Sequence, residues 1–229
     1  MMRASGILLP ISSIPSNYGI GCFSKEAYAF VDQLAEAGQK YWQILPLGPT
    51  GYGDSPYQSF STFAGNPYFI DLEELIQRDL LTAAECAECD WGGSKSYVDY
   101  EKVYLSRFSL LRKAYRRFYQ MDGKEKELQL IREKMEAFEK EQGFWLADYC
   151  LYMAIKDSLE GISWNQWPED LKTRKPEALA KAREERKEDI SFYAFQQFWF
   201  YRQWNRLKKY ANDRGIKIIG DLPIYVAFD

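Results

Sequence analysis

The sequence predicts an α/β fold, in which helices and parallel strands alternate along the chain. Near each end, a helical pattern of apolar residues is followed by a glycine and then by a short apolar run, an order typical of α/β folds. Between these two units lies a long stretch with helical spacing of its apolar residues. The chain has 229 residues, of which 46% are hydrophobic and 28% charged, enough to bury one sizeable core or two small ones.

The first unit begins at Ser24, a suitable N-cap. Apolar residues then recur at helical spacing as far as Gly38, which should end the helix: Ala27, Phe30, Val31, Leu34 and Ala35. The run Tyr41 to Leu47 is short and apolar, and Gly48 and Pro49 close it. This pattern predicts a buried parallel strand that leads into a loop.

The middle of the chain should be an all-helical insertion. Two sets of apolar residues step by three and four positions, as on one face of a helix: Tyr104, Phe108, Leu111, Tyr115 and Phe118, then Leu128, Ile131, Met135 and Phe138. Acidic and basic residues balance between Lys124 and Lys140, which indicates a solvated helix face. The mixed charges from Lys172 to Asp189 predict another exposed helix or loop.

The last unit repeats the order of the first. An aromatic helix should stop at Arg214 and Gly215, and it carries a set of large apolar residues: Phe192, Phe195, Phe198, Tyr201 and Leu207. The run Ile216 to Ile219 predicts a second buried strand. Asp221 follows this strand, where a carboxylate would emerge at the carboxyl edge of a parallel sheet, although a strand-end turn would also explain it.

Composition excludes several classes of function. The 30 basic and 33 acidic residues give a net charge of −3, which is too neutral for the basic surface of a nucleic-acid binder. No apolar run is long enough for a membrane span, and the opening Ile7 to Ile11 is too short and interrupted by Pro10 for a signal peptide. We therefore expect a cytoplasmic protein with neither a nucleic-acid nor a membrane partner.

Cysteine and histidine usage narrows the chemistry. Four cysteines in 229 residues fit a reducing compartment with free thiols. The chain has no histidine, so catalysis by a serine or cysteine paired with histidine is excluded within it, and acid–base chemistry must use carboxylates. Cys86 and Cys89 form one C-x-x-C pair with no second pair, so a helix surface explains them better than a metal or redox site.

The loop after the first predicted strand, residues 48–68, has the composition of a ligand site. It combines flat aromatic faces with polar groups: Tyr52, Tyr57, Phe60 and Tyr68 beside Asp54, Ser55 and Asn66. Sugars need both, because their C–H faces are apolar and their rims carry hydroxyls. The glycines at 48, 51 and 53 do not match a phosphate-binding motif. An ordered loop whose aromatic residues only pack is the alternative.

Five blocks of sequence, taken together, resemble a known family. They are residues 6–14 (GILLPISSI), 42–50 (WQILPLGPT), 53–61 (GDSPYQSFS), 64–68 (AGNPY) and 219–227 (IGDLPIYVA). In this order they resemble the N-terminal part of the 4-α-glucanotransferases (amylomaltases) of glycoside hydrolase family 77. The resemblance covers the chain from its first residues to its last.

The resemblance implies a fold and an activity. The fold is an α-amylase-type (β/α)₈ barrel with helical insertions, with Trp42 to Leu47 on its first strand and Ile216 to Ile219 on an early one. The activity is retaining transfer of α-1,4-glucan segments between maltodextrins such as maltooligosaccharides and amylose, through a glycosyl-aspartate and without a cofactor. By matching position, Tyr57 resembles the aromatic platform beside the reacting sugar, with Ser55 near it. Asp221 resembles a supporting carboxylate, and Tyr52 is a further candidate for a glucan contact.

The resemblance also implies which parts of the enzyme the chain holds. Residues 1–72 would begin the barrel, residues 73–190 would form the helical insertion, and residues 191–229 would return to the barrel. The family's nucleophile aspartate, acid/base glutamate and substrate-binding histidine lie on later strands, so the chain would hold about three of eight strands. We therefore expect residues 1–229 alone to be inactive, and to be marginally stable or to self-associate through the edge left after Val226.

Three other functions stay open at this point. A non-catalytic α-glucan-binding remnant of the same fold would keep Tyr57 and the aromatic loop. A helical interaction protein would depend on residues 101–189, although their heptads are too short to favour it. Hydrolysis of α-glucans on the same barrel is the third.

Overall fold

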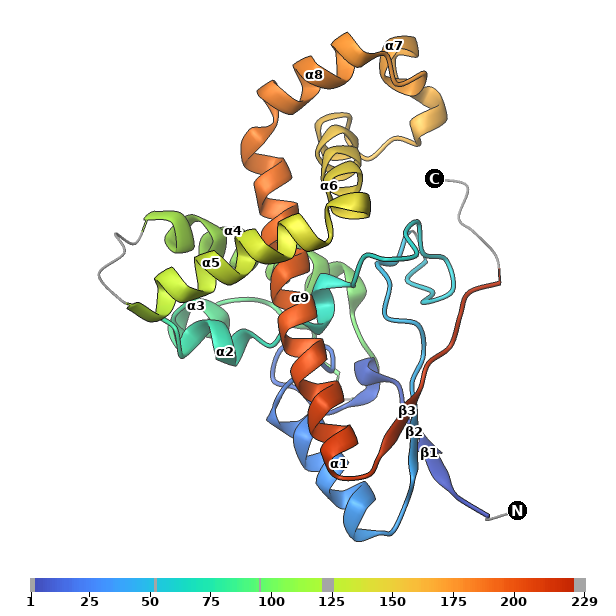
Figure 1. Cartoon of the computed structure of the whole chain (residues 1–229). Helices are drawn as coiled ribbons and strands as arrows, with labels where there is room; N and C mark the ends of the chain where they lie inside the picture. The colour runs from blue at the N-terminus through green and yellow to red at the C-terminus, as the bar shows by residue number, and fades with distance from the viewer. Residues whose placement is uncertain (1–2, 52, 95, 121–125, 225–229) are drawn as a thin grey trace.

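A three-stranded parallel sheet lies at one end of the molecule (Figure 1). The computed structural model describes residues 3–51, 53–94, 96–120 and 126–224. In these residues the strands are β1 (Gly6–Leu8), β2 (Tyr41–Gln43) and β3 (Lys217–Ile219), in the order β1-β2-β3. The register places Trp42 of β2 beside Ile7 and Ile218, so the sheet joins segments from both ends of the chain.

Two helices carry the connections between the strands. Helix α1 (Lys25–Glu36) lies between β1 and β2, and α9 (Lys187–Asp213) leads into β3. Trp42 is fully buried, with the ring of Phe30 on α1 at 5.2 Å, and its indole nitrogen donates to the Leu9 carbonyl at 2.8 Å. Helix α1 ends just before Gly38, as predicted. This glycine follows the C-cap and has a φ of 69°, the left-handed conformation that commonly ends a helix.

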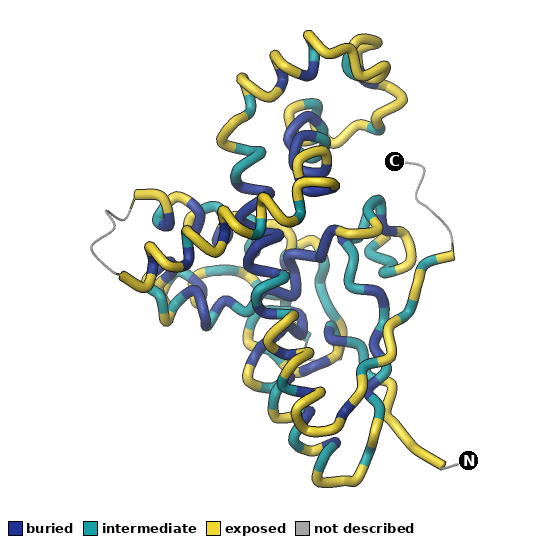
Figure 2. Tube along the Cα trace, in the orientation of Figure 1, coloured by how far each residue is buried: buried dark blue, intermediate teal, exposed yellow. Residues whose placement is uncertain are grey.

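The remaining helices gather around α9. They are α2 (Leu72–Ile76), α3 (Ala83–Ala87), α4 (Tyr100–Gln120), α5 (Lys126–Glu141), α6 (Gly143–Ser158), α7 (Glu169–Lys172) and α8 (Pro176–Glu185). Three short 3₁₀ turns, at Ile11–Ser13, Pro67–Phe69 and Trp164–Gln166, join some of these elements. Figure 2 shows that the middle of α9 is buried, and its large aromatic side chains form the centre of the main core. None of the described helices is long and apolar enough to cross a membrane.

The structure confirms the predicted helices. The two middle patterns fall on α4 and α5, the charged stretch falls partly on α8, and the aromatic helix ends at the predicted Arg214. Ser24 occupies the N-cap position of α1, but its hydroxyl donates to Glu26 at 2.6 Å and does not cap the helix.

The predicted strands need correction. The run Trp42 to Leu47 is the second strand of the sheet and not the first, because Gly6–Leu8 precedes it, and only Tyr41–Gln43 pair as a strand. The run Ile216 to Ile219 was expected to be buried, but Lys217 and Ile219 are exposed. The reason is that β3 pairs only with β2 among the described residues, so it lies at an edge of the sheet.

An ion pair ties α3 to α4 and gives a prediction for acid stability. Two guanidinium nitrogens of Arg117 donate to the Glu85 carboxylate at 2.6 and 2.7 Å, and this lowers the pKa of Glu85 to about 2. Because this pKa lies below the ordinary value of 4.5, the pair stabilises the fold fully above pH 4.5, and the stabilisation is lost as the pH falls toward 2. We expect Glu85→Gln to cost about 1 kcal/mol at pH 7, a figure discounted for solvent screening.

Urea unfolding at several pH values measures this effect. The difference in unfolding free energy between wild type and Glu85→Gln should shrink as the pH falls below 4.5. Glu88→Gln, at an exposed site next to the same helix, is the control and should have little effect. A difference that stays constant with pH would contradict the assignment.

Candidate functional site

Helix α9 holds the loop that follows β2 in place. The side-chain amide of Gln197 accepts a hydrogen bond from the Gly65 nitrogen at 2.7 Å and donates one to the Gly65 carbonyl at 2.9 Å. One turn further along α9, the Tyr201 hydroxyl donates to the Phe63 carbonyl. Gln197 is fully buried, so both hydrogen bonds are shielded from water. The loop is therefore fixed to the central helix of the molecule.

The Gln197 amide gives a second stability prediction. Gln197→Leu leaves the buried Gly65 N–H and C=O without their partners, and we expect a loss of about 3 kcal/mol in unfolding free energy. The neighbouring Gln196 is the matched control, because it is equally buried and neither of its amide atoms has a hydrogen-bond partner among the described residues. Gln196→Leu should be neutral or stabilising in the same urea titration. Equal losses for the two variants would show that the Gly65 hydrogen bonds contribute nothing specific.

Two sequence-predicted residues meet across the molecule. The Tyr57 hydroxyl donates to Oδ2 of Asp221 at 2.8 Å, although the residues are 164 positions apart. The hydrogen bond raises the pKa of Tyr57, because loss of the phenol proton would place two anionic oxygens in contact. Tyr57 is 39% exposed, so its ring remains accessible to a ligand. Asp221 lies two residues after the end of β3, so the pair lies near the carboxyl ends of β2 and β3.

The other predicted residues of the loop have different roles. Ser55 lies beside Tyr57 in the chain, and its hydroxyl accepts from the Tyr57 nitrogen at 3.4 Å, in the turn that presents the ring. Asn66 caps the 3₁₀ turn at Pro67–Phe69 by accepting from the Tyr68 nitrogen at 3.0 Å, and Tyr68 itself is buried. Asn66 and Tyr68 therefore support the loop. Tyr52 lies outside the described residues.

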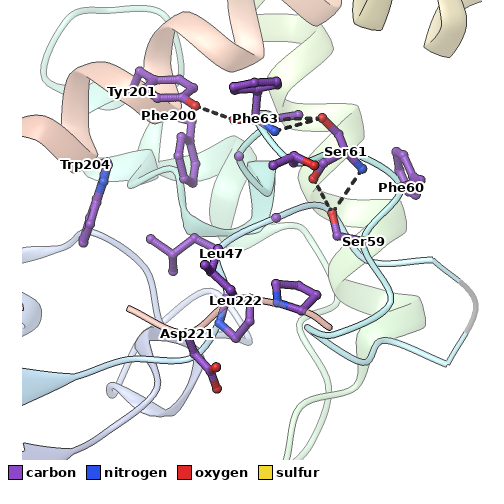
Figure 3. Close-up of a pocket in the computed structure, with 16 residues that line it drawn as sticks. Leu47, Ser59, Phe60, Ser61, Phe63, Phe200, Tyr201, Trp204, Asp221 and Leu222 are labelled. Carbon is purple, nitrogen blue, oxygen red and sulfur yellow. Dashed lines mark hydrogen bonds between the residues drawn. The ribbon is translucent and has the colours of Figure 1, made fainter. Parts of the chain in front are cut away.

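A cavity of about 280 Å³ lies beside Asp221, between this loop and α9 (Figure 3). Aromatic side chains form much of its wall: Phe60 and Phe63 from the loop, and Phe200, Tyr201 and Trp204 from α9. Ser59, Ser61 and Thr62 add polar groups, and Leu47 and Leu222 add apolar ones. Figure 3 shows the Asp221 carboxylate pointing away from the aromatic residues of α9. The combination of flat apolar faces with hydroxyls suits a sugar.

Sequence reasoning missed the contribution of α9 to this cavity. Phe200 and Trp204 lie on the predicted aromatic helix but were not among the residues singled out on it. The sequence pattern gave no sign that these residues contact the loop, because this contact depends on tertiary packing. Gly65 is the one clue in the sequence to this contact. A glycine lets the backbone pass close to another element, and Gly65 does pass close to Phe200 on α9.

Metal and thiol chemistry find little support here. Within residues 3–51, 53–94, 96–120 and 126–224, no three cysteine, aspartate or glutamate side chains gather in a group that could hold a metal ion. Cys86 is buried on α3, and burial raises the pKa of its thiol to about 11. Its thiol is therefore protonated at neutral pH and is a poor nucleophile.

Comparison with known proteins identifies the family. The family model described as 4-alpha-glucanotransferase, glycoside hydrolase family 77, matches residues 9–229. The chain belongs to this family. It is 49% identical to a 4-alpha-glucanotransferase of Clostridium butyricum over 96% of the chain and 43% of that protein. It is 47% identical to the 4-alpha-glucanotransferase of Thermus thermophilus over 99% of the chain and 43% of that protein.

A solved structure agrees with the sequence matches. The amylomaltase from Streptococcus agalactiae, solved in complex with acarbose, superposes with a TM-score of 0.91 at 42% sequence identity. The superposition covers 98% of this chain and 44% of that one. The chain thus has an α/β fold similar to that of amylomaltase, and it spans less than half the length of the family members that it matches.

Proposed function

We propose that this chain is the N-terminal part of a 4-α-glucanotransferase that transfers α-1,4-glucan segments between maltodextrins with retention. The observation that carries the proposal is the hydrogen bond between Tyr57 and Asp221, which joins the aromatic loop after β2 to the carboxylate after β3. The related amylomaltase from Streptococcus agalactiae, which binds acarbose, supports an α-glucan as the ligand.

Each residue of the pair has a distinct role in this proposal. The exposed ring of Tyr57 packs against the apolar face of a glucose unit. Asp221 fixes the Tyr57 hydroxyl and accepts hydrogen bonds from sugar hydroxyls through its remaining lone pairs. Ser55 stabilises the turn that presents Tyr57, and Tyr52 is proposed as a further glucan contact. Asp221 is a supporting carboxylate in this scheme and not the nucleophile.

The chemistry itself needs a pair of carboxyl groups. In retaining transfer, one carboxylate attacks the anomeric carbon and a second carboxyl group protonates the leaving oxygen, with the two about 5 Å apart. The second group, now a carboxylate, then takes the proton of the acceptor's 4-hydroxyl, whose oxygen displaces the enzyme carboxylate from the anomeric carbon. We propose that both groups belong to later strands of a (β/α)₈ barrel, which residues 1–72 and 191–229 begin, with residues 73–190 as a mostly helical insertion. The four free cysteines are in keeping with a cytoplasmic enzyme.

A disproportionation assay tests the proposal. A protein that carries these residues together with the later strands should convert maltotriose into glucose and longer oligosaccharides. Residues 1–229 alone should release no glucose, because they lack the carboxylate pair. Binding of maltotriose without turnover by the longer protein would favour a non-catalytic glucan-binding protein. Turnover by residues 1–229 would disprove the proposal that both catalytic carboxyl groups belong to later strands.

The exposed sheet edges give a prediction about residues 1–229 in isolation. Both outer strands carry exposed apolar residues: Ile7 and Leu8 on β1 and Ile219 on β3. Strand edges of this kind pair with other chains, so we expect residues 1–229 to self-associate as their concentration rises. Light scattering should show an increasing mass, and Ile219→Lys should reduce it. A single monomer mass over the whole concentration range would contradict this expectation.

A further inference from the structure

A second cavity, of about 500 Å³, lies in the helical part of the molecule. Its walls come from α6, from the segment that includes the 3₁₀ turn Trp164–Gln166 and α7, and from α8. Figure 1 shows α7 and α8 arching over α6 at the end of the molecule away from the sheet. None of these helices lines the cavity beside Asp221.

Aromatic rings line the wall of this cavity. The rings of Tyr152 and Trp167 lie 5.2 Å apart at an interplanar angle of 33°. The indole nitrogen of Trp167 donates to the Ile162 carbonyl at 3.1 Å, so the polar atom of this ring is satisfied within the protein. Trp164, also on the cavity wall, is 38% exposed. Trp167 is buried, so the ring surface on which a sugar face can pack comes from Trp164 and from the half-buried Tyr152.

The charged residues at and next to this cavity form ion pairs with one another. Arg174 is paired with Asp148 at 2.9 Å, and Lys172 with Glu169 at 3.5 Å. Arg183 approaches the other oxygen of Asp148 at 3.9 Å. Each of these cations lies within 4 Å of a carboxylate, and Arg174 and Arg183 share Asp148, so the rim offers charged hydrogen-bond donors beside acceptors. A ligand with many hydroxyls matches such a rim.

The two cavities share a wall. Phe60 and Ser61, from the loop that α9 holds, line both the 280 Å³ cavity beside Asp221 and the 500 Å³ cavity at Trp164. We infer that the cavity at Trp164 is a distal subsite, which binds further glucose units of the same α-glucan that occupies the Tyr57–Asp221 site. This inference rests on the proposed function, and it assigns the helical part a role in selecting longer glucans.

Calorimetric titrations of residues 1–229 with maltotriose and maltoheptaose test the inference. Trp164→Ala should weaken maltoheptaose binding about tenfold and leave maltotriose binding unchanged, because only the longer glucan reaches both sites. Arg174→Gln, on the exposed rim, should also weaken maltoheptaose binding, and this variant leaves the core unchanged. Leu105→Ala, at an exposed position on α4 that lines neither cavity, is the control and should change neither affinity.

The possible results separate the two proposals. If Tyr57→Ala weakens binding of both glucans but Trp164→Ala and Arg174→Gln bind maltoheptaose like wild type, the distal subsite is disproved and the proposed function stands. If the folded wild-type chain binds neither glucan, the proposed site at Tyr57 fails, and the distal subsite fails with it. Selective loss of maltoheptaose binding in both distal variants supports the inference.

Discussion

Replacing Gly65 by alanine should destabilise the chain by about 3 kcal/mol, because the added methyl group has no room. A Cβ built on Gly65 would lie 2.1 Å from two ring carbons of Phe200, and Phe200 is itself 3% exposed and packed in the core. Gly65 is also buried, and both its N–H and its carbonyl are hydrogen-bonded to the side chain of Gln197. Its backbone therefore cannot shift without breaking these bonds. The ring of Phe200 must move instead.

Urea unfolding of Gly65→Ala measures the cost, and two further variants show its origin. Gly93→Ala is the control, because nothing lies within 4 Å of its added Cβ, and it should change the unfolding free energy by less than about 0.5 kcal/mol. Adding Phe200→Leu to Gly65→Ala should recover part of the loss, since the smaller side chain makes room. Purely additive losses would mean that the clash with Phe200 is not the cause. Because Phe200 lines the cavity beside Asp221, Gly65→Ala should also weaken glucan binding.

Replacing Tyr57 by alanine should weaken ligand binding strongly. The change removes both the exposed ring and the hydroxyl that binds Asp221, and we expect maltotriose affinity to fall about tenfold. Stability should change little, since the side chain is 39% exposed. Asp221→Asn should cause a loss of about the same size, because an amide cannot replace the charge-assisted hydrogen bonds of a carboxylate.

A double-mutant cycle separates the ring from the hydroxyl. Tyr57→Phe keeps the ring and loses only the hydrogen bond to Asp221, so it should bind more tightly than Tyr57→Ala. Combining Tyr57→Phe with Asp221→Asn should cost less than the sum of the two single changes, because both act on one hydrogen bond. Leu130→Ala, at an exposed position on α5, is the truncation control. Strict additivity would show that Tyr57 and Asp221 act independently.

The sequence predicted the helices better than the strands. Apolar residues that recur over several turns give a strong signal, and α1, α4, α5 and α9 were all predicted from such patterns. Strand β1 has only three residues, with Pro10 two positions after it, and no periodicity can be read from so short a run. The exposure of β3 was also beyond prediction, because an apolar run does not reveal how many neighbours its strand will have.

The candidate site was only partly predictable. Tyr57, Ser55 and Asp221 were chosen from the sequence, and the structure places Tyr57 in direct contact with Asp221. The sequence could not reveal that α9 supplies one wall of the cavity, since Phe200 and Trp204 follow the same helical spacing as core residues. It also gave no indication of the cavity at Trp164, which forms where α6, α7 and α8 meet. Both features depend on contacts between segments distant in sequence.

Amide chemical shifts recorded during a maltotriose titration show whether α-glucans bind at Tyr57 and Asp221, as we propose. Under this account, the shifts should change progressively and saturate at Tyr57, at Asp221 and along residues 59–65, which line the adjacent cavity. In Tyr57→Ala the same changes should need about tenfold more maltotriose to reach saturation. A folded chain whose spectrum is unaffected by maltotriose, or whose changes fall elsewhere, would contradict the claim.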